Sequence, residues 1–352
     1  MRSLFYRKQA RLFWLGLLFV FLAGPAWAQS QKKGDASLRI EYQYIRTGDF
    51  KDDNFTFDYW KTDSHIGLLS GDYAITDRWS VYAALPYVQK RFRGDPDDPF
   101  GGDPHNPNDP WWIDFVPPDK RFIDDEKFHG GFQDMSFGVS YLALDGPLVL
   151  APYIGYGWPT TNYPFYAKAA SGANLWTLPV GLSATWVPYF SDWQFDGNLA
   201  YVFSEKPLDI NVDYWLAYLS GRYWFKPQFA MNIFFSAKWI REGLVMPWDF
   251  TDDPTYGKFP EDFDTIEWWQ HDRLLRHRFV NMGIGFDYFM NDKYLLSGTY
   301  FQTIWSEQTN EVDRAFTLCL LYTSPSPRDQ RPNLVCRLRV VKGGGGGGGG
   351  GG

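Results

Sequence analysis

The chain has 352 residues, of which 20% are aromatic and 21% charged, and its formal net charge is -7. This acidic excess argues against a nucleic-acid-binding protein, which needs clustered Lys and Arg side chains to contact phosphates. The two cysteines, Cys319 and Cys336, are too few for a small scaffold held together by disulfides.

The first 28 residues have the pattern of a secretory signal peptide. Basic residues between Arg2 and Arg11 precede an apolar run from Leu12 to Ala23, and the small-residue cleavage motif Ala-Trp-Ala follows at residues 26–28. The apolar run is shorter than the roughly 20 residues that a membrane-spanning helix needs. We therefore expect residues 1–28 to be removed after export.

Polar and apolar residues alternate in many of the later segments. In QFAMNIFFSAKWIR, residues 228–241, Met231 and Ile233 share one parity while Asn232 has the other. A period of two is typical of β-strands. The same pattern recurs over residues 38–45, 79–88, 133–142, 175–186, 195–203 and 279–288. A soluble sandwich would bury the apolar faces against a second sheet, whereas an outer-membrane barrel exposes them to lipid around a watery lumen.

The connections between these segments favour the membrane barrel. Tight turns are predicted at residues 76–78, 145–147, 190–192, 226–228 and 291–293, with longer polar connections between them. Short periplasmic turns and long extracellular loops alternate in this way in bacterial barrels. The sequence therefore predicts an all-β fold, one antiparallel transmembrane β-barrel of about 12 strands over residues 29–317, whose twelfth strand starts near Asp313.

Three prolines, Pro86, Pro152 and Pro179, lie inside the predicted strands. Proline cannot donate a hydrogen bond to the sheet, so it usually marks a bulge or an edge. Bulges are our first interpretation. The alternative is an opening in the wall through which an apolar solute could leave sideways.

The C-terminal residues 318–352 have the features of a sequencing artefact. The run CLLYTSPSPRD, from Cys319 to Asp329, resembles a translated transposon-type sequencing adapter, and LVCRL, residues 334–338, resembles the downstream adapter in the same frame. The glycine run from Gly343 to Gly352 is what an unbroken series of G bases would encode. A flexible Gly-rich linker is the alternative. We expect the natural sequence to depart from this one near Thr317.

Charged residues inside the predicted strands are assigned to the lumen, because a charge that faces lipid at the bilayer midplane costs about 2–4 kcal/mol. The candidate lumen and solute-binding residues are Arg39, Glu41, Asp134, Asp196, Arg222, Lys238 and Asp287. Both signs are present in similar number, so a self-neutralising network that holds the wall together is the first interpretation. A solute-binding constriction is the second.

Two of the predicted loops are strongly acidic. In the first, residues 94–131, the carboxylates of Asp95, Asp97, Asp98 and Asp103 are weak candidates for calcium ligands. Their spacing matches no regular calcium loop, so we assign no metal site and expect turn formation in a solvated loop. This loop is long enough to fold inward and narrow the lumen. Together with residues 248–272 it predicts an acidic mouth that favours cations or neutral solutes, or that contacts lipopolysaccharide through divalent cations.

Three runs carry a resemblance to a known family: GGFQDMSFGVSYLAL (residues 130–144), APYIGYGWPTTNY (151–163) and LPVGLSATW (178–186). A strand opened by Gly-x-x-Asp, followed by a strand that ends in an aromatic-Pro-Thr turn, resembles the transporter-like outer-membrane barrels of the family named for the meta-pathway of phenol degradation. The resemblance implies movement of hydrophobic or aromatic compounds across the outer membrane.

These observations predict a pore or transporter-like protein of the bacterial outer membrane, for passive passage of small hydrophobic or aromatic solutes. The expected partners are outer-membrane lipid, lipopolysaccharide and a small-molecule solute, with no nucleic acid and no cofactor. The oligomeric state stays open. A non-conducting surface or structural barrel whose loops bind partners is the alternative.

No enzymatic activity is expected. A phospholipase-like barrel needs a serine beside a histidine, but Ser64 and His65 are neighbours in the chain and would point to opposite faces of a strand. The pairs Asp252-Asp253 and His271-Asp272 are only a faint match to the acids of an outer-membrane protease.

We expect sequencing of the gene past the codon for Thr317 to give a different coding sequence in place of residues 318–352. An intact gene that encodes the same tail would contradict the artefact interpretation.

Overall fold

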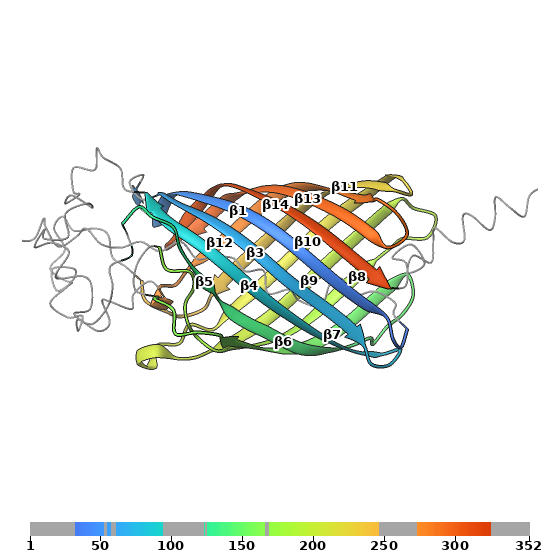
Figure 1. The fold of residues 1–352 in the computed structure, drawn as a ribbon, viewed down its shortest axis with the longest axis horizontal. Coiled ribbons are helices and arrows are strands. Elements are labelled where there is room, and N and C mark those ends of the chain that lie inside the picture. Colours follow the sequence, from blue (N-terminus) through green and yellow to red (C-terminus); the bar gives the residue numbers. More distant parts are fainter. Residues whose placement is uncertain are drawn as a thin grey trace, which may run out of the picture.

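The computed structural model describes residues 32–52, 55–57, 61–93, 123, 125–165, 169–245 and 273–324, which form one antiparallel β-barrel (Figure 1). The strands are β1 (Ala36–Asp52), β2 (Phe55–Phe57), β3 (Lys61–Ala74), β4 (Trp79–Arg93), β5 (His129–Phe132), β6 (Asp134–Tyr141), β7 (Leu148–Pro159), β8 (Thr177–Trp186), β9 (Trp193–Ser204), β10 (Tyr214–Lys226), β11 (Phe229–Ile240), β12 (Arg278–Phe289), β13 (Tyr294–Glu307) and β14 (Thr309–Ser324). A short 3₁₀ helix, Pro207–Asp209, precedes β10. The described residues include no helix that is long and apolar enough to cross a membrane. The predicted signal peptide lies outside them.

The barrel closes where β14 pairs with β1, from Ala36 opposite Ser324 to Lys51 opposite Thr309. The short strands β5 and β6 follow one another along β4 and form one wall strand, and β2 and β3 do the same along β1, with β2 paired to its outer end. The wall therefore has 12 strands, which confirms the predicted architecture. Closure leaves no open sheet edge, as a structure that crosses hydrocarbon requires.

Of the three strand prolines, Pro86 marks a bulge. Tyr87 of β4 pairs with Phe132 of β5, while Ala84 pairs with Ser136 of β6, so the β5–β6 side has an extra residue between these pairs. The prediction is confirmed at Pro86. The prediction is wrong at Pro152, which keeps regular register opposite Leu182 of β8. On the other side, the pairs between β7 and β6 reach only to Tyr153, so Pro152 needs no N–H group to donate a hydrogen bond to β6.

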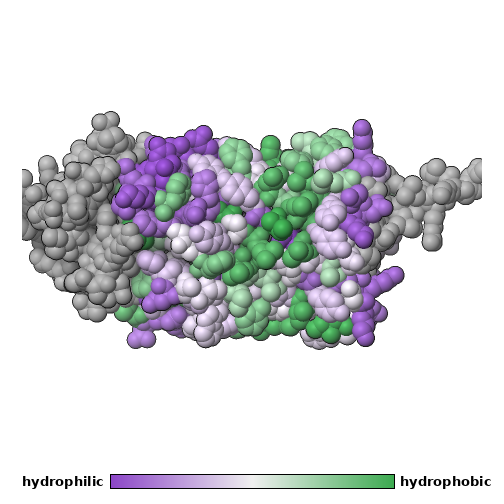
Figure 2. Space-filling view, in the orientation of Figure 1, coloured by the Kyte–Doolittle hydropathy of each residue, from purple (hydrophilic) through white to green (hydrophobic). Residues whose placement is uncertain are grey.

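The two faces of each wall strand differ as the alternation predicted. On β11, Ile233 is 51% exposed on the outside whereas Asn232 is 8% exposed on the inside. Ile40 on β1 and Ile284 on β12 have similar outward exposure. Figure 2 shows the result on the face in view, where hydrophobic surface crosses the middle of the barrel as a band and hydrophilic surface lies at either end. Outward aromatic rings pack at the turn end of this band, where Trp193 contacts Tyr223, as in the interfacial girdles of membrane barrels.

The tight turns predicted at residues 76–78, 145–147, 190–192, 226–228 and 291–293 each join two consecutive wall strands at one end of the barrel. The last connection at the other end differs from the prediction. β13 ends at Glu307 and β14 begins at Thr309, with Gln308 between them at a left-handed φ of 55°. The two strands pair with each other only as far as Phe301 opposite Ala315, and beyond that point they pair with β12 and β1. The predicted start of the last strand near Asp313 was wrong. Both strands continue past the hydrophobic band, and in that region polar residues do not indicate a loop.

The last strand also runs beyond Thr317. Residues 318–324 pair with Ala36–Tyr42 of β1 and complete the closure. Backbone pairing places weak demands on side-chain identity, since its hydrogen bonds join main-chain groups. The artefact interpretation of residues 318–352 therefore stays a prediction, and residues 325–352 lie outside the described part of the chain.

We predict that a charge on the outer face in the middle of a strand destabilises the barrel. Ile233→Lys should lower the free energy of unfolding by about 2–4 kcal/mol, because the ammonium group would face hydrocarbon. Urea titration of the protein refolded in lipid vesicles measures this loss, with Ile233→Leu as the matched control. Equal stability of the two variants would contradict the assignment of the outer face to lipid.

Candidate functional site in the barrel lumen

A buried arginine links two acidic residues inside the barrel. Arg222 on β10 lies with its Nη1 3.2 Å from Asp196 Oδ2 of β9 and with its Nε 2.7 Å from Asp287 Oδ2 of β12. All three side chains are buried. We call Asp196, Arg222 and Asp287 the lumen triad. Sequence parity assigns each of them to the interior, but it does not show that they meet.

Neutral donors also bind the two carboxylates of the triad. Asp196 accepts hydrogen bonds from Thr185 Oγ1 at 2.9 Å and from Gln194 Nε2 at 2.8 Å, and Asp287 accepts one from Ser297 Oγ at 2.5 Å. A buried charge is tolerated when it is paired and hydrogen-bonded in this way. This is the arrangement that the first interpretation, a network holding the wall together, requires.

The other candidate residues face the interior but lie apart from the triad. At the loop end, Asp134 accepts a 2.5 Å hydrogen bond from Tyr163, and the ammonium group of Lys238 lies 4.2 Å from the centre of the Tyr214 ring. Arg39 and Glu41 occupy inward positions on β1, between the outward Leu38, Ile40 and Tyr42. The seven candidates therefore divide into one contacting group and separate side chains along the lumen.

The interior also holds an apolar surface that the sequence analysis did not predict. Ile45, Ile66, Val88, Phe234, Phe301, Val312 and Ala315 form one buried cluster, and Tyr218 packs against it. We call these eight residues the inner apolar surface. They come from β1, β3, β4, β10, β11, β13 and β14. A lumen lined only for water would not need them, and at 0–4% exposure the seven residues of the cluster pack against one another in the interior.

Glycines on the inner wall make room for aromatic rings. The Phe234 ring lies over Gly283 of β12, so closely that an added Cβ would overlap the ring. In the same way the Tyr82 ring lies over Gly138 of β6, with a Cβ there 2.5 Å away. Any larger residue at these positions would push the rings away from the wall and into the passage. Glycines at inward positions of the strand patterns are the feature of the sequence from which these rings could have been predicted.

A second cluster continues the aromatic lining toward the turn end. Tyr82, Tyr153 and Ala200 pack together, with Leu216 against them. The hydroxyl of Tyr153 donates a 2.9 Å hydrogen bond to Asn198 Oδ1, so its polar atom is satisfied by the wall. The rings of Tyr82 and Tyr153 meet edge to face, with their centres 6.4 Å apart.

The weak calcium candidates Asp95, Asp97, Asp98 and Asp103 lie outside the described residues. Among the residues that the structure does describe, no group of three or more His, Cys, Asp or Glu side chains could hold a metal ion. Nearer β5, the Nε2 atom of His129 lies 2.6 Å from Asp125 Oδ1. His129 is also the first residue of β5, although it falls within the loop predicted over residues 94–131.

Comparison with known proteins finds similarity of fold. No protein-family model matches the chain, and no curated protein matches it. Among solved structures it is similar to the COG4313 outer membrane channel from Pseudomonas putida F1, with a TM-score of 0.61 and 15% identity over 86% of this chain and 99% of that chain. The fold is that of an outer-membrane β-barrel. At this identity the similarity establishes the fold and not the solute.

Two further similarities are weaker. The translocator domain of the autotransporter NalP from Neisseria meningitidis matches with a TM-score of 0.45 and 9% identity over 84% of this chain and 90% of that chain. The NanC porin matches with a TM-score of 0.41 and 9% identity over 81% of this chain and 98% of that chain. The narrower resemblance to the phenol meta-pathway family stays a prediction.

We predict that Arg222→Ala destabilises the barrel by about 3–5 kcal/mol, because it leaves two buried carboxylates without their shared cation. Urea unfolding in detergent measures the change. Asp196→Asn and Asp287→Asn, added to Arg222→Ala, should recover part of the stability by removing the uncompensated charges. An Arg222→Ala barrel as stable as the original would mean that the triad does not hold the wall.

Proposed function

We propose that the chain is a passive pore or transporter-like protein of the bacterial outer membrane for small hydrophobic or aromatic solutes. The observation that carries this proposal is the inner apolar surface, with Phe234, Phe301 and Tyr218 facing inward from three strands. Wall stability alone can be supplied by polar pairs, such as Ser80 with Ser140 at 2.6 Å. An aromatic lining would instead lower the free energy of an aromatic solute in the passage.

The lumen triad and the inner apolar surface suggest how such a pore would select its solutes. A narrow passage is expected for 12 strands, since eight can be filled by side chains and sixteen leave an open channel. A solute that passes Arg222 and the aromatic rings must fit between charged and apolar walls. The acidic sequence of the predicted loops would disfavour anions at the mouth.

Export and location belong to the same proposal. The signal-peptide pattern of residues 1–28 supports passage out of the cytoplasm, and the outward hydrophobic band supports insertion in a bilayer. The outer membrane is the bilayer of bacteria that houses such barrels. The proposal includes contact of the outer wall with lipid and lipopolysaccharide, and membership of the phenol meta-pathway family.

We also propose that the barrel is not an enzyme. The Ser64 side chain is buried on the inner face, whereas His65 lies on the outer face with its Nδ1 2.7 Å from the Tyr42 hydroxyl. These two groups cannot act together as nucleophile and base, because both must reach the same substrate atom. This geometry supports the sequence interpretation.

The test is transport through the purified full chain. In planar bilayers we expect discrete current steps, and in vesicles we expect phenol to enter faster than a neutral sugar and to emerge chemically unchanged. A silent bilayer together with vesicles that take up neither compound would overturn the pore proposal and favour a structural barrel.

Two neighbouring phenylalanines on β11 give a matched pair of variants. Phe234→Ala removes a ring from the inner apolar surface, whereas Phe235→Ala removes one from the lipid face. We expect Phe234→Ala to lower the ratio of phenol to sugar uptake several-fold and Phe235→Ala to leave it unchanged. Equal ratios in both variants would show that the inner ring does not select the solute.

A further inference from the structure

A row of arginines lies on the outer face of the wall, at the loop end of β14, β1, β3 and β4. Arg46 of β1 pairs with Arg314 of β14 on one side and with Asp63 of β3 on the other, and Asp63 pairs with Arg91 of β4. Arg93 lies two residues further along β4. Side chains at directly opposed positions point to the same face of a sheet. We call Arg46, Arg91, Arg93 and Arg314 the outer arginine patch.

The face is fixed by the neighbours of the row. Arg46 has the parity of Ile40 and Tyr42, which are 57% and 50% exposed on the outside of β1. Arg91 lies over the ring of Phe128, at 4.6 Å from its centre, and Phe128 is itself exposed. The patch therefore faces away from the lumen and is separate from the site proposed for solute passage.

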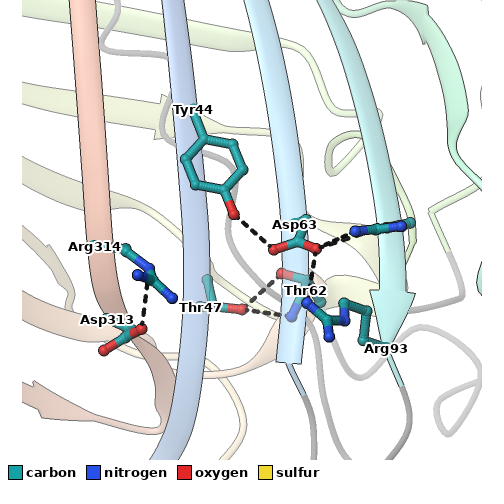
Figure 3. A network of polar contacts seen from close by, with 8 residues as sticks. Tyr44, Thr47, Thr62, Asp63, Arg93, Asp313 and Arg314 are labelled. Carbon is teal, nitrogen blue, oxygen red and sulfur yellow. Dashed lines mark hydrogen bonds and ion pairs between the residues drawn. The ribbon is translucent and has the colours of Figure 1, made fainter.

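The patch has more positive than negative charge. Asp63 is 2% exposed and lies beneath the patch, with its Oδ2 2.8 Å from Arg91 Nη2 and 3.5 Å from Arg93 Nη1. Its Oδ1 accepts a 3.0 Å hydrogen bond from Tyr44, as Figure 3 shows. Asp313 Oδ2 lies 3.6 Å from Arg314 Nε. Both side chains are about half exposed, so solvent screens this ion pair.

The cations of the patch repel one another across the sheet. Like charges at directly opposed positions destabilise a pair of strands, and Arg46 is directly opposite Arg314. Within the described residues no ion pair of Arg46 is found, so the repulsion is not relieved by a carboxylate of its own. An anion placed between the two guanidinium groups would turn this repulsion into attraction.

The height of the patch places it beside the headgroups of the membrane. On the same outer faces, Tyr44 and His65 come next below the patch, followed by Tyr42 and then by the exposed apolar Ile40 and Leu69. Figure 2 shows hydrophilic surface at the loop-side ends of these strands, next to the hydrophobic band. Guanidinium groups at this level meet phosphorylated glycolipid in the outer leaflet of an outer membrane.

We propose that the outer arginine patch is a binding site for the phosphate groups of lipopolysaccharide in the outer leaflet. The planar guanidinium group binds phosphate through two parallel hydrogen bonds, which makes arginine the preferred residue for such sites. Basic clusters beside a membrane recognise anionic headgroups in the same way. The inference rests on the outer-membrane location proposed above, and it names the contact that location requires.

The test measures binding of lipid A to the full chain in detergent, by native mass spectrometry. We expect bisphosphorylated lipid A to bind, and the double variant Arg46→Gln with Arg314→Gln to bind it about 30-fold more weakly, which is about 2 kcal/mol. Arg78→Gln is the matched control, since Arg78 is exposed in the turn at the opposite end of the barrel. Equal affinity of the double variant and the control would overturn the proposal.

The melting temperature of the double variant, measured without and with lipid A, gives a second test. Without lipid A, removal of two repelling charges should leave the melting temperature unchanged or raise it. With lipid A, the variant should be less stabilised than the original chain. A variant destabilised equally in both conditions would show that the arginines serve the wall and bind no lipid.

Two ligand controls separate the sources of phosphate. Lipid A stripped of its phosphates should bind weakly to the original chain, and inorganic phosphate should not displace bisphosphorylated lipid A at equal concentration. Equal binding of the stripped lipid, or ready displacement by phosphate, would refute a lipopolysaccharide site. Solute passage through the double variant should be unchanged, so a failure of this inference is distinguishable from a failure of the pore proposal.

Discussion

The structure depends on one constraint: inside hydrocarbon, every main-chain N–H and C=O group must find its partner within the protein. Pairing of β14 with β1 meets this constraint, because it removes the two edges that an open sheet would expose. Once the sheet is closed, each strand has an inside and an outside, and the period of two decides which residues lie on each. The outward band of aliphatic side chains and the inward polar pairs both follow from closure.

On the inner face of the barrel, polar side chains of neighbouring strands form hydrogen bonds with one another. Thr47 and Thr62 share a 2.6 Å hydrogen bond, and Gln43 donates to Thr317 at 3.0 Å. Arg222 reaches further, since it joins β9 and β12 through β10. The inner apolar surface differs from these polar contacts, because its seven buried residues come from strands on several sides of the barrel. We propose that it contacts the solute.

Much of the architecture could be predicted from the sequence, because alternation and turn residues are local signals. The alternation of Ile233 with Asn232 is enough to assign the two faces of β11, and the five tight turns are enough to order the strands. The lumen triad could not be predicted as a contact, since Asp196 and Asp287 are separated by strand pairings whose register is not encoded locally. The start of β14 at Thr309 was missed for a different reason, since it lies among polar residues that resemble a loop.

The outer arginine patch shows what parity alone leaves out. Parity assigns a residue to a face, but the energy of a charge on the outer face also depends on its depth in the bilayer, and it falls toward zero at the interfaces. Strand β1 has 17 residues, whereas a tilted strand crosses the hydrocarbon in about 9–11. Its outer end therefore projects beyond the hydrophobic band, and Arg46 can share the parity of Ile40 without facing hydrocarbon. The rule that assigns every strand charge to the lumen holds only within the band, and the charges beyond it are the ones that we propose bind phosphate groups.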